Sequence, residues 1–140
     1  MIDKSKSPLF QCTIRVRDYE CDAQGIVNNA NYQHYYEIAR HDFFNENGLS
    51  FFDLHESGTD AVVVSAYIRY TNSLKGGDNF ISTVDFLERD GIRYIFNQKI
   101  VRLHDNKVCS TGKFEVVCIT NGKLAKPEAF DRAFGKYFEV

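Results

Sequence analysis

The stretch Asp22-Ala-Gln-Gly-Ile-Val-Asn-Asn-Ala-Asn-Tyr32 decides the fold, together with the residues that follow it as far as 46. Asp22 and Gly25 hold the first and fourth positions of a sequence typical of a type I turn. Asn28 and Asn29 then offer side-chain oxygens that suit the first N–H groups of a helix. The stretch therefore predicts a carboxylate, a tight turn and a helix start within one short segment.

Apolar residues continue behind this turn with the spacing of a helix. They recur at steps of four, three and four: Tyr32, Tyr36, Ala39 and Phe43. Such steps place the side chains on one face of a helix. We predict a helix over about 30–46 that ends at Asn47-Gly48, because both residues tolerate the left-handed backbone conformation. Ser50 is placed to cap a short second helix that Phe51, Phe52 and Leu54 pack down.

The rest of the chain follows a period of two, which is typical of strands. We predict strands over five segments: 9–19, 61–70, 80–88, 92–103 and 107–120. Turn residues separate the later ones: Lys75-Gly-Gly-Asp78, Arg89-Asp-Gly91, His104-Asp-Asn-Lys107 and Asn121-Gly122. In 80–88, Val84 and Phe86 are expected on one side and Leu87 on the other. A last helix is predicted from Pro127 to about 135.

This order of elements favours an α+β arrangement. No strand–helix–strand units alternate along the chain, so a parallel doubly wound sheet is excluded. The economical solution is a sheet wrapped around the one long helix, and 140 residues suit a single domain over 1–140. Because a helix covers only one face of a sheet, an apolar outer face or an open edge favours assembly with further copies.

Composition narrows the possible partners and the compartment. The net charge is −2 and no run of five or six like charges occurs, so electrostatics give no case for binding nucleic acid or an anionic membrane. No apolar run approaches the roughly 18 residues that span a bilayer. Residues 1–8 lack the apolar centre of a secretory signal. The four cysteines form no C-x-x-C pair, which favours free thiols and a cytoplasmic protein.

The segment Asp22-x-x-Gly25-Ile-Val27-Asn28-x-x-x-Tyr32-x-x-Tyr35-x-Glu37-x-Ala39-Arg40 resembles the signature of hotdog-fold acyl-CoA thioesterases of the 4-hydroxybenzoyl-CoA thioesterase type. The resemblance implies an antiparallel five-stranded sheet wrapped around one long central helix. Two features depart from the family pattern. Ala23-Gln24 stands where many members have proline, and Asn28-Asn29 stands where many have aromatic residues.

The resemblance also implies a site and a reaction. Asp22 would be the nucleophile or general base of thioester hydrolysis, in the turn closed by Gly25, and the backbone N–H of Asn29 would polarise the carbonyl. Five residues are expected to contact the substrate: Val27, Asn28, Tyr32, Ser65 and Tyr67. The expected substrate is an acyl-CoA and the expected assembly is a homodimer or homotetramer. We expect no metal and no other cofactor, because Glu37 and His41 have no third ligand in evidence.

Other interpretations compete with this one. From spacing alone, Asp22 is an ordinary turn residue that hydrogen-bonds nearby N–H groups. Within the same fold, the substrate carrier is either coenzyme A or acyl carrier protein. A hydratase or dehydratase usually needs a histidine base near the helix start, whereas His34 and His41 lie inside the predicted helix. A non-catalytic module that binds acyl-CoA is the competitor from a different class.

Overall fold

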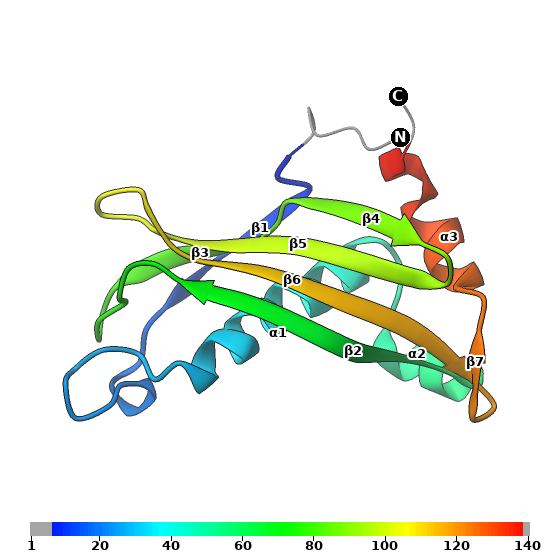
Figure 1. Ribbon diagram of the computed structural model, residues 1–140, viewed down its shortest axis with the longest axis horizontal. Coiled ribbons are helices and arrows are strands. Elements are labelled where there is room, and N and C mark those ends of the chain that lie inside the picture. Colours follow the sequence, from blue (N-terminus) through cyan, green and yellow to red (C-terminus); the bar gives the residue numbers. More distant parts are fainter. Residues whose placement is uncertain (1–6, 139–140) are drawn as a thin grey trace.

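A long helix, α1 (Ala30–Glu46), lies against one face of an antiparallel sheet in the computed structural model, which describes residues 7–138 (Figure 1). Two shorter helices, α2 (Phe51–Glu56) and α3 (Glu128–Phe134), accompany it, with 3-10 turns at Asp18–Glu20 and Gly135–Phe138. The strands are β1 (Phe10–Arg15), β2 (Thr59–Tyr70), β3 (Asn79–Val84), β4 (Phe86–Asp90), β5 (Arg93–Arg102), β6 (Lys107–Thr120) and β7 (Lys123–Ala125). Within these residues no helix is both long and apolar enough to cross a membrane.

The sheet confirms the predicted architecture and adds two short strands. Its main path runs β1-β3-β5-β6-β2, which is five strands, while β4 pairs with β5 and β7 pairs with β6. The β7 strand was not predicted. It follows the Asn121-Gly122 turn, where both residues have positive φ angles of 50° and 80°. Such a pair suits the tight two-residue turn of a hairpin, so the chain returns beside β6 before α3 begins.

One strand prediction is wrong, because the segment 80–88 is two strands rather than one. Ser82 lies opposite Ile100, whereas Phe86 lies opposite Asn97, so the register slips by one residue between them. Asp85 is the extra residue, and its carboxylate accepts a hydrogen bond from the Thr83 hydroxyl at 2.7 Å. A β-bulge of this kind exchanges the two faces of a strand. Leu87 therefore joins the core at 2% exposure, and Phe86 is only half-buried.

Two predictions about the helices are wrong, one for Asn47 at the end of α1 and one for the packing of Phe52 in α2. Gly48 takes the left-handed conformation at φ +76°, but Asn47 does not and instead donates a side-chain hydrogen bond to the Phe43 carbonyl at 2.9 Å. The Ser50 hydroxyl caps α2 as predicted, accepting from the Asp53 N–H at 3.3 Å. Phe52 was expected to pack α2 down, yet its side chain is 69% exposed.

Buried polar groups hold α1 against the sheet. The Tyr36 hydroxyl donates to Ser110 Oγ at 2.6 Å, and Arg40 donates to Gln98 Oε1 at 3.0 Å. The Gln98 amide in turn donates to the carbonyls of Tyr36 and Thr83, both at 3.1 Å. Burial lowers the pKa of Arg40 to about 10, so the side chain keeps its charge at neutral pH. Because buried polar groups are costly when unpaired, this network fixes how α1 lies against the sheet.

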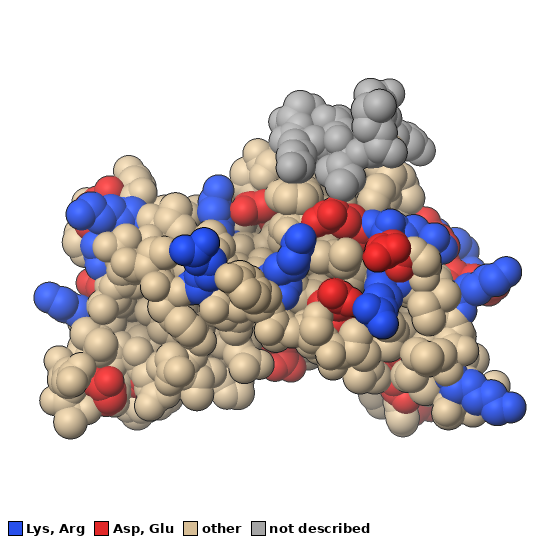
Figure 2. Space-filling model, viewed as in Figure 1, with Lys and Arg blue, Asp and Glu red and all other residues tan. Residues whose placement is uncertain are grey.

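The outer face of the sheet is charged, whereas one edge is open. In Figure 2, acidic and basic side chains are scattered among uncharged ones over the upper part of this face, and the lower part is mostly uncharged. Ion pairs cross this face, including Lys99 with Asp85 at 3.8 Å and Lys113 with Glu88 at 3.6 Å. The β2 strand ends the strand path, and its Val62–Val64 segment is 41 to 50% exposed. The open edge predicted from the sequence is therefore present at β2.

Candidate active site

The predicted turn at Asp22 is present and leaves part of the carboxylate unoccupied. The Gly25 N–H donates to the Asp22 carbonyl at 3.0 Å, and Gly25 takes a φ of +80° that suits a residue without a side chain. Asp22 Oδ1 accepts a hydrogen bond from the Gln24 N–H at 2.8 Å. The Asp22 side chain therefore stabilises the turn, which agrees with the interpretation of Asp22 as a turn residue that hydrogen-bonds a nearby N–H group. Its Oδ2 atom has no hydrogen-bond partner within residues 7–138.

At the start of α1, hydrogen bonds occupy every N–H but one. Ala30 donates to Asn28 Oδ1 at 3.0 Å, Asn31 to the Asn28 carbonyl at 2.9 Å, and Tyr32 to the Asn29 carbonyl at 3.2 Å. Of the two predicted caps, therefore, only Asn28 acts through its side chain. The Asn29 N–H has no acceptor in the described part of the chain. Because exposed N–H groups at a helix start carry partial positive charge, this donor suits an anionic oxygen.

A pocket of about 370 Å³ joins these two groups. Its lining residues come from the turn, the helix start and the end of β2: Asp22, Ile26, Val27, Asn29, Tyr32, Tyr70, Thr71, Asn72 and Ser73. The volume falls within the range typical of small-molecule sites. The structure thus brings together four of the residues predicted for the site, Asp22 and Asn29 with Val27 and Tyr32.

Two tyrosines form an aromatic wall of this pocket. The rings of Tyr32 and Tyr70 meet edge to face, with centroids 5.0 Å apart. The Tyr70 hydroxyl donates to the Asn29 carbonyl at 3.4 Å and so steadies the helix start. Burial raises the pKa of Tyr32 to about 12, which keeps its phenol neutral at physiological pH. The sequence analysis did not assign Tyr70 to the site. Its position as the last residue of a predicted strand, directly before a polar loop, could have indicated that it belongs there.

Ser65 and Tyr67 lie elsewhere in the single chain. They pair with Glu115 and Lys113 of β6, whereas Ala66 between them pairs with the buried Phe114. Side chains alternate between the two faces of a sheet, so Ser65 and Tyr67 point to the outer face, away from α1. Neither lines the Asp22 pocket. Their role in substrate binding therefore stays a prediction.

Other charged side chains of the sequence near the turn and on α1 do not line the pocket beside Asp22. The Glu20 carboxylate accepts the Arg17 N–H at 2.7 Å, and neither Glu20 nor Asp18 lines the pocket. Glu37 pairs with His41 at 3.3 Å on the surface of α1. Within residues 7–138, no group of three His, Cys, Asp or Glu side chains is placed to hold a metal ion. The four cysteines are unpaired, as the sequence predicted.

A model of one protein family matches residues 16–136, which include the turn, α1 and every strand from β2 to β7. That family is described as the thioesterase-like superfamily. The chain belongs to this superfamily. The resemblance inferred from the segment Asp22–Arg40 is thereby confirmed.

Individual relatives agree with this membership of the thioesterase-like superfamily. The acyl-CoA thioesterase YbgC of Haemophilus influenzae is 29% identical over 126 residues, which cover 88% of this chain and 89% of that protein. The chloroplastic acyl-acyl carrier protein thioesterase ATL3 of Arabidopsis thaliana is 27% identical over 118 residues. In that pair the match covers 84% of this chain but only 62% of the plant protein.

Solved structures support the fold of this thioesterase-like chain. A Staphylococcus aureus protein solved in complex with CoA superposes with a TM-score of 0.82 at 21% identity, over 92% of this chain and 83% of that one. At this identity the likeness bears on the fold alone. With the sheet and helix described above, it confirms the expected hotdog architecture.

Proposed function

We propose that the protein is a cytoplasmic acyl-CoA thioesterase, which hydrolyses the thioester bond of an acyl-coenzyme A to a free acid and CoA. One observation carries the proposal. Asp22 and Asn29 line the same pocket; within residues 7–138 the Asp22 carboxylate has an oxygen without a partner, and the Asn29 N–H is the one at the start of α1 without an acceptor. Thioester hydrolysis needs these two groups: one to supply or activate a nucleophile, and one to receive the developing oxyanion.

In the proposed reaction, the thioester carbonyl oxygen lies against the Asn29 N–H. Two routes then use the Asp22 carboxylate. As a general base it takes a proton from water, which attacks the carbonyl carbon, and the tetrahedral intermediate then breaks its C–S bond and expels the thiolate. As a nucleophile it attacks directly, forms an acyl anhydride and expels the thiolate, and water then cleaves the anhydride. Thiolate is a good leaving group, so neither route needs a strong general acid. The rings of Tyr32 and Tyr70 would bound the acyl group or the pantetheine arm.

We also propose that the protein assembles as a homodimer, or as a homotetramer of such dimers, through the edge of β2. Within residues 7–138 no strand pairs with the outer side of β2, so this edge presents backbone N–H and C=O groups for a partner strand, together with the exposed Val62–Val64 segment. Pairing with the same edge of a second copy satisfies both at once and gives a two-fold symmetric contact. A substitution of Val63 by lysine would place charge at this edge. We expect it to reduce the mass measured by light scattering to that of a monomer.

An acyl carrier protein thioesterase is the second candidate, because the Arabidopsis relative acts on that carrier by its description. The chemistry at the thioester is the same for both carriers. The two differ in what lies beyond the pantetheine, which is an adenosine phosphate in one and a folded protein in the other. Only a direct comparison of both classes of substrate separates them.

Release of free thiol tests the proposal. The substrates are aromatic and aliphatic acyl-CoAs of several lengths, with acyl carrier protein thioesters alongside. We expect Asp22→Asn to fold normally and to lose at least about 100-fold in kcat. Asp18→Asn is the matched control, since this nearby carboxylate lies outside the pocket. Near wild-type kcat in Asp22→Asn would refute the role of Asp22. Binding of acyl-CoA without thiol release across all substrates would instead favour a non-catalytic binding module.

A further inference from the structure

One wall of the Asp22 pocket is a connecting segment without regular structure. We call residues 71–75, which leave β2 on the way to β3, the strap. Thr71, Asn72 and Ser73 of the strap line the pocket. Its far end is bonded to the loop that carries the carboxylate, since the Val27 N–H donates to the Leu74 carbonyl at 2.8 Å. The position of the strap therefore sets both a wall of the pocket and the end of the Asp22 loop.

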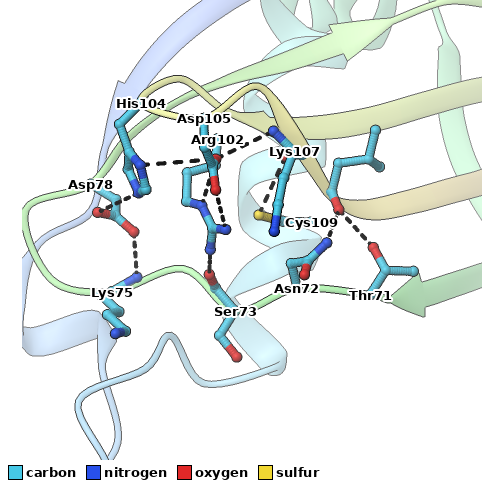
Figure 3. A network of polar contacts seen from close by, with 11 residues as sticks. Thr71, Asn72, Ser73, Lys75, Asp78, Arg102, His104, Asp105, Lys107 and Cys109 are labelled. Carbon is cyan, nitrogen blue, oxygen red and sulfur yellow. Dashed lines mark hydrogen bonds and ion pairs between the residues drawn. The ribbon is translucent and has the colours of Figure 1, made fainter.

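On its other side, the strap is held by the hairpin between β5 and β6 (Figure 3). The N–H groups of Thr71 and Asn72 donate to the Cys109 carbonyl at 2.8 and 3.3 Å. The side chains of the same two residues donate to the Val108 carbonyl, both at 2.8 Å. These bonds fix the beginning of the strap but leave Ser73 and Leu74 beyond their reach.

Arg102 supplies the contact at that point. Its Nη1 atom donates to the Ser73 carbonyl, while Nε and Nη2 donate to the two carboxylate oxygens of Asp105 at 3.0 and 2.7 Å. Figure 3 shows the guanidinium between Asp105 and Ser73. The Arg102 side chain is only 13% exposed, and the Lys107 N–H donates to Asp105 as well, at 3.3 Å. Because the guanidinium is planar, the two hydrogen bonds to Asp105 also fix the direction in which the third nitrogen, Nη1, donates. A lysine ammonium cannot reproduce this geometry.

These contacts form one path from the hairpin to the catalytic turn. Arg102 holds the Ser73 carbonyl, and the next residue, Leu74, accepts from Val27. Val27 follows Ile26, whose carbonyl accepts from the Asp22 N–H at 2.8 Å. We propose that Arg102 is a positioning residue of the thioesterase site, which acts through Ser73 and the strap to hold the Asp22 loop against the helix start. This inference rests on the proposed function.

The test combines activity with a local structural measurement. Displacing a reacting group by about 1 Å can cost up to about 100-fold in rate. We expect Arg102→Gln to lower kcat by about 10- to 100-fold at a temperature well below its unfolding midpoint. We also expect faster hydrogen exchange at the Val27 amide, with unchanged exchange at the Phe96 amide in the core. A loss of general stability would speed both amides and leave kcat of the folded protein unchanged.

Arg89→Gln is the matched control. Arg89 makes the same two-nitrogen contact with a carboxylate, here that of Asp131 at 2.8 and 3.0 Å, between β4 and α3. We expect this variant to keep wild-type kcat and wild-type exchange at Val27. Arg102→Lys is expected to behave like Arg102→Gln, because a lysine ammonium keeps the charge but cannot make the hydrogen bonds of the planar guanidinium to Asp105 and Ser73 together.

Two results would overturn the proposal: kcat of Arg102→Gln within twofold of the Arg89→Gln control, or unchanged exchange at Val27. If Arg102→Gln fails to fold, Asp105→Asn is judged by the same two measurements, since it releases the guanidinium without removing it. If the wild-type protein releases no thiol from any substrate, the proposed function fails. The exchange comparison alone then decides whether Arg102 holds the Asp22 loop.

Discussion

Replacing Asn29 by proline would remove the proposed oxyanion donor and almost nothing else. Proline has no backbone N–H and fixes φ near −65°, and the φ of Asn29 is −55°. The N–H that is lost makes no hydrogen bond within residues 7–138, so no internal bond is sacrificed. The Asn29 side chain makes no capping bond, and the cap from Asn28 stays in place. Proline is also well accepted at the start of a helix.

The expected magnitude follows from the chemistry of oxyanion stabilisation. Removing one such donor costs about 2.7 to 4 kcal/mol of transition-state stabilisation, which corresponds to about 100- to 1,000-fold in kcat. The Tyr70 hydroxyl and the Tyr32 N–H still hold the Asn29 carbonyl, at 3.4 and 3.2 Å. We therefore expect the melting temperature to fall by only a few degrees. Because proline restricts the residue before it, helix content should be checked by circular dichroism.

Free-thiol release with an acyl-CoA that the wild-type protein hydrolyses gives the measurement. Asn29→Ala is the matched control, since it keeps the N–H and loses only the side chain, and we expect it to keep wild-type kcat. A folded Asn29→Pro variant with wild-type kcat would refute the role of this N–H. An equal loss in both variants would refute it too, because the side chain would then be responsible.

Two further predictions concern stability and pH. In Gly112→Ala the new Cβ would lie 2.6 Å from a ring carbon of Phe114, so we expect a loss of about 1 to 3 kcal/mol in denaturant unfolding. Gly135→Ala has open space and a helical φ of −53°, and should be neutral or slightly stabilising; equal stability of the two variants would contradict the packing argument. The Arg102 guanidinium holds the pKa of Asp105 well below its usual range. A depressed pKa contributes stability that is present above the unfolded value of about 4 and is lost as pH falls below it. The unfolding midpoint of the wild type should therefore drop more steeply below about pH 4 than that of Asp105→Asn, and parallel profiles would contradict this assignment.

The features that the sequence predicts well are those with local causes. The turn at Asp22 depends on residues within a few positions of one another. The face of α1 is set by the spacing of its own aromatic side chains, all of which are buried in the structure. The cap from Asn28 is likewise a contact between near neighbours. Local chemistry of this kind fixes where the carboxylate and the helix start lie along the chain.

The features that the sequence does not predict depend on distant partners. The bulge at Asp85 leaves the alternation of 80–88 intact in the sequence, and only pairing with β5 shows that the faces exchange. Strand periodicity separates Ser65 and Tyr67 from their neighbours, but it does not say which face meets α1. Tyr70 enters the site because β2 ends beside the helix start, which is a property of the tertiary fold.

The pocket is built from segments that lie far apart in the sequence, and no single segment encloses it. Residues 22–32 supply the carboxylate and the donor, residues 70–73 supply the opposite side, and the hairpin near residue 102 holds that side in place. Contacts between segments so far apart in sequence form slowly, because the loops between them must close first. Ligand binding therefore requires that all three segments have come together, so it reports on the complete fold, whereas the helical signal reports on α1 and the shorter helices alone.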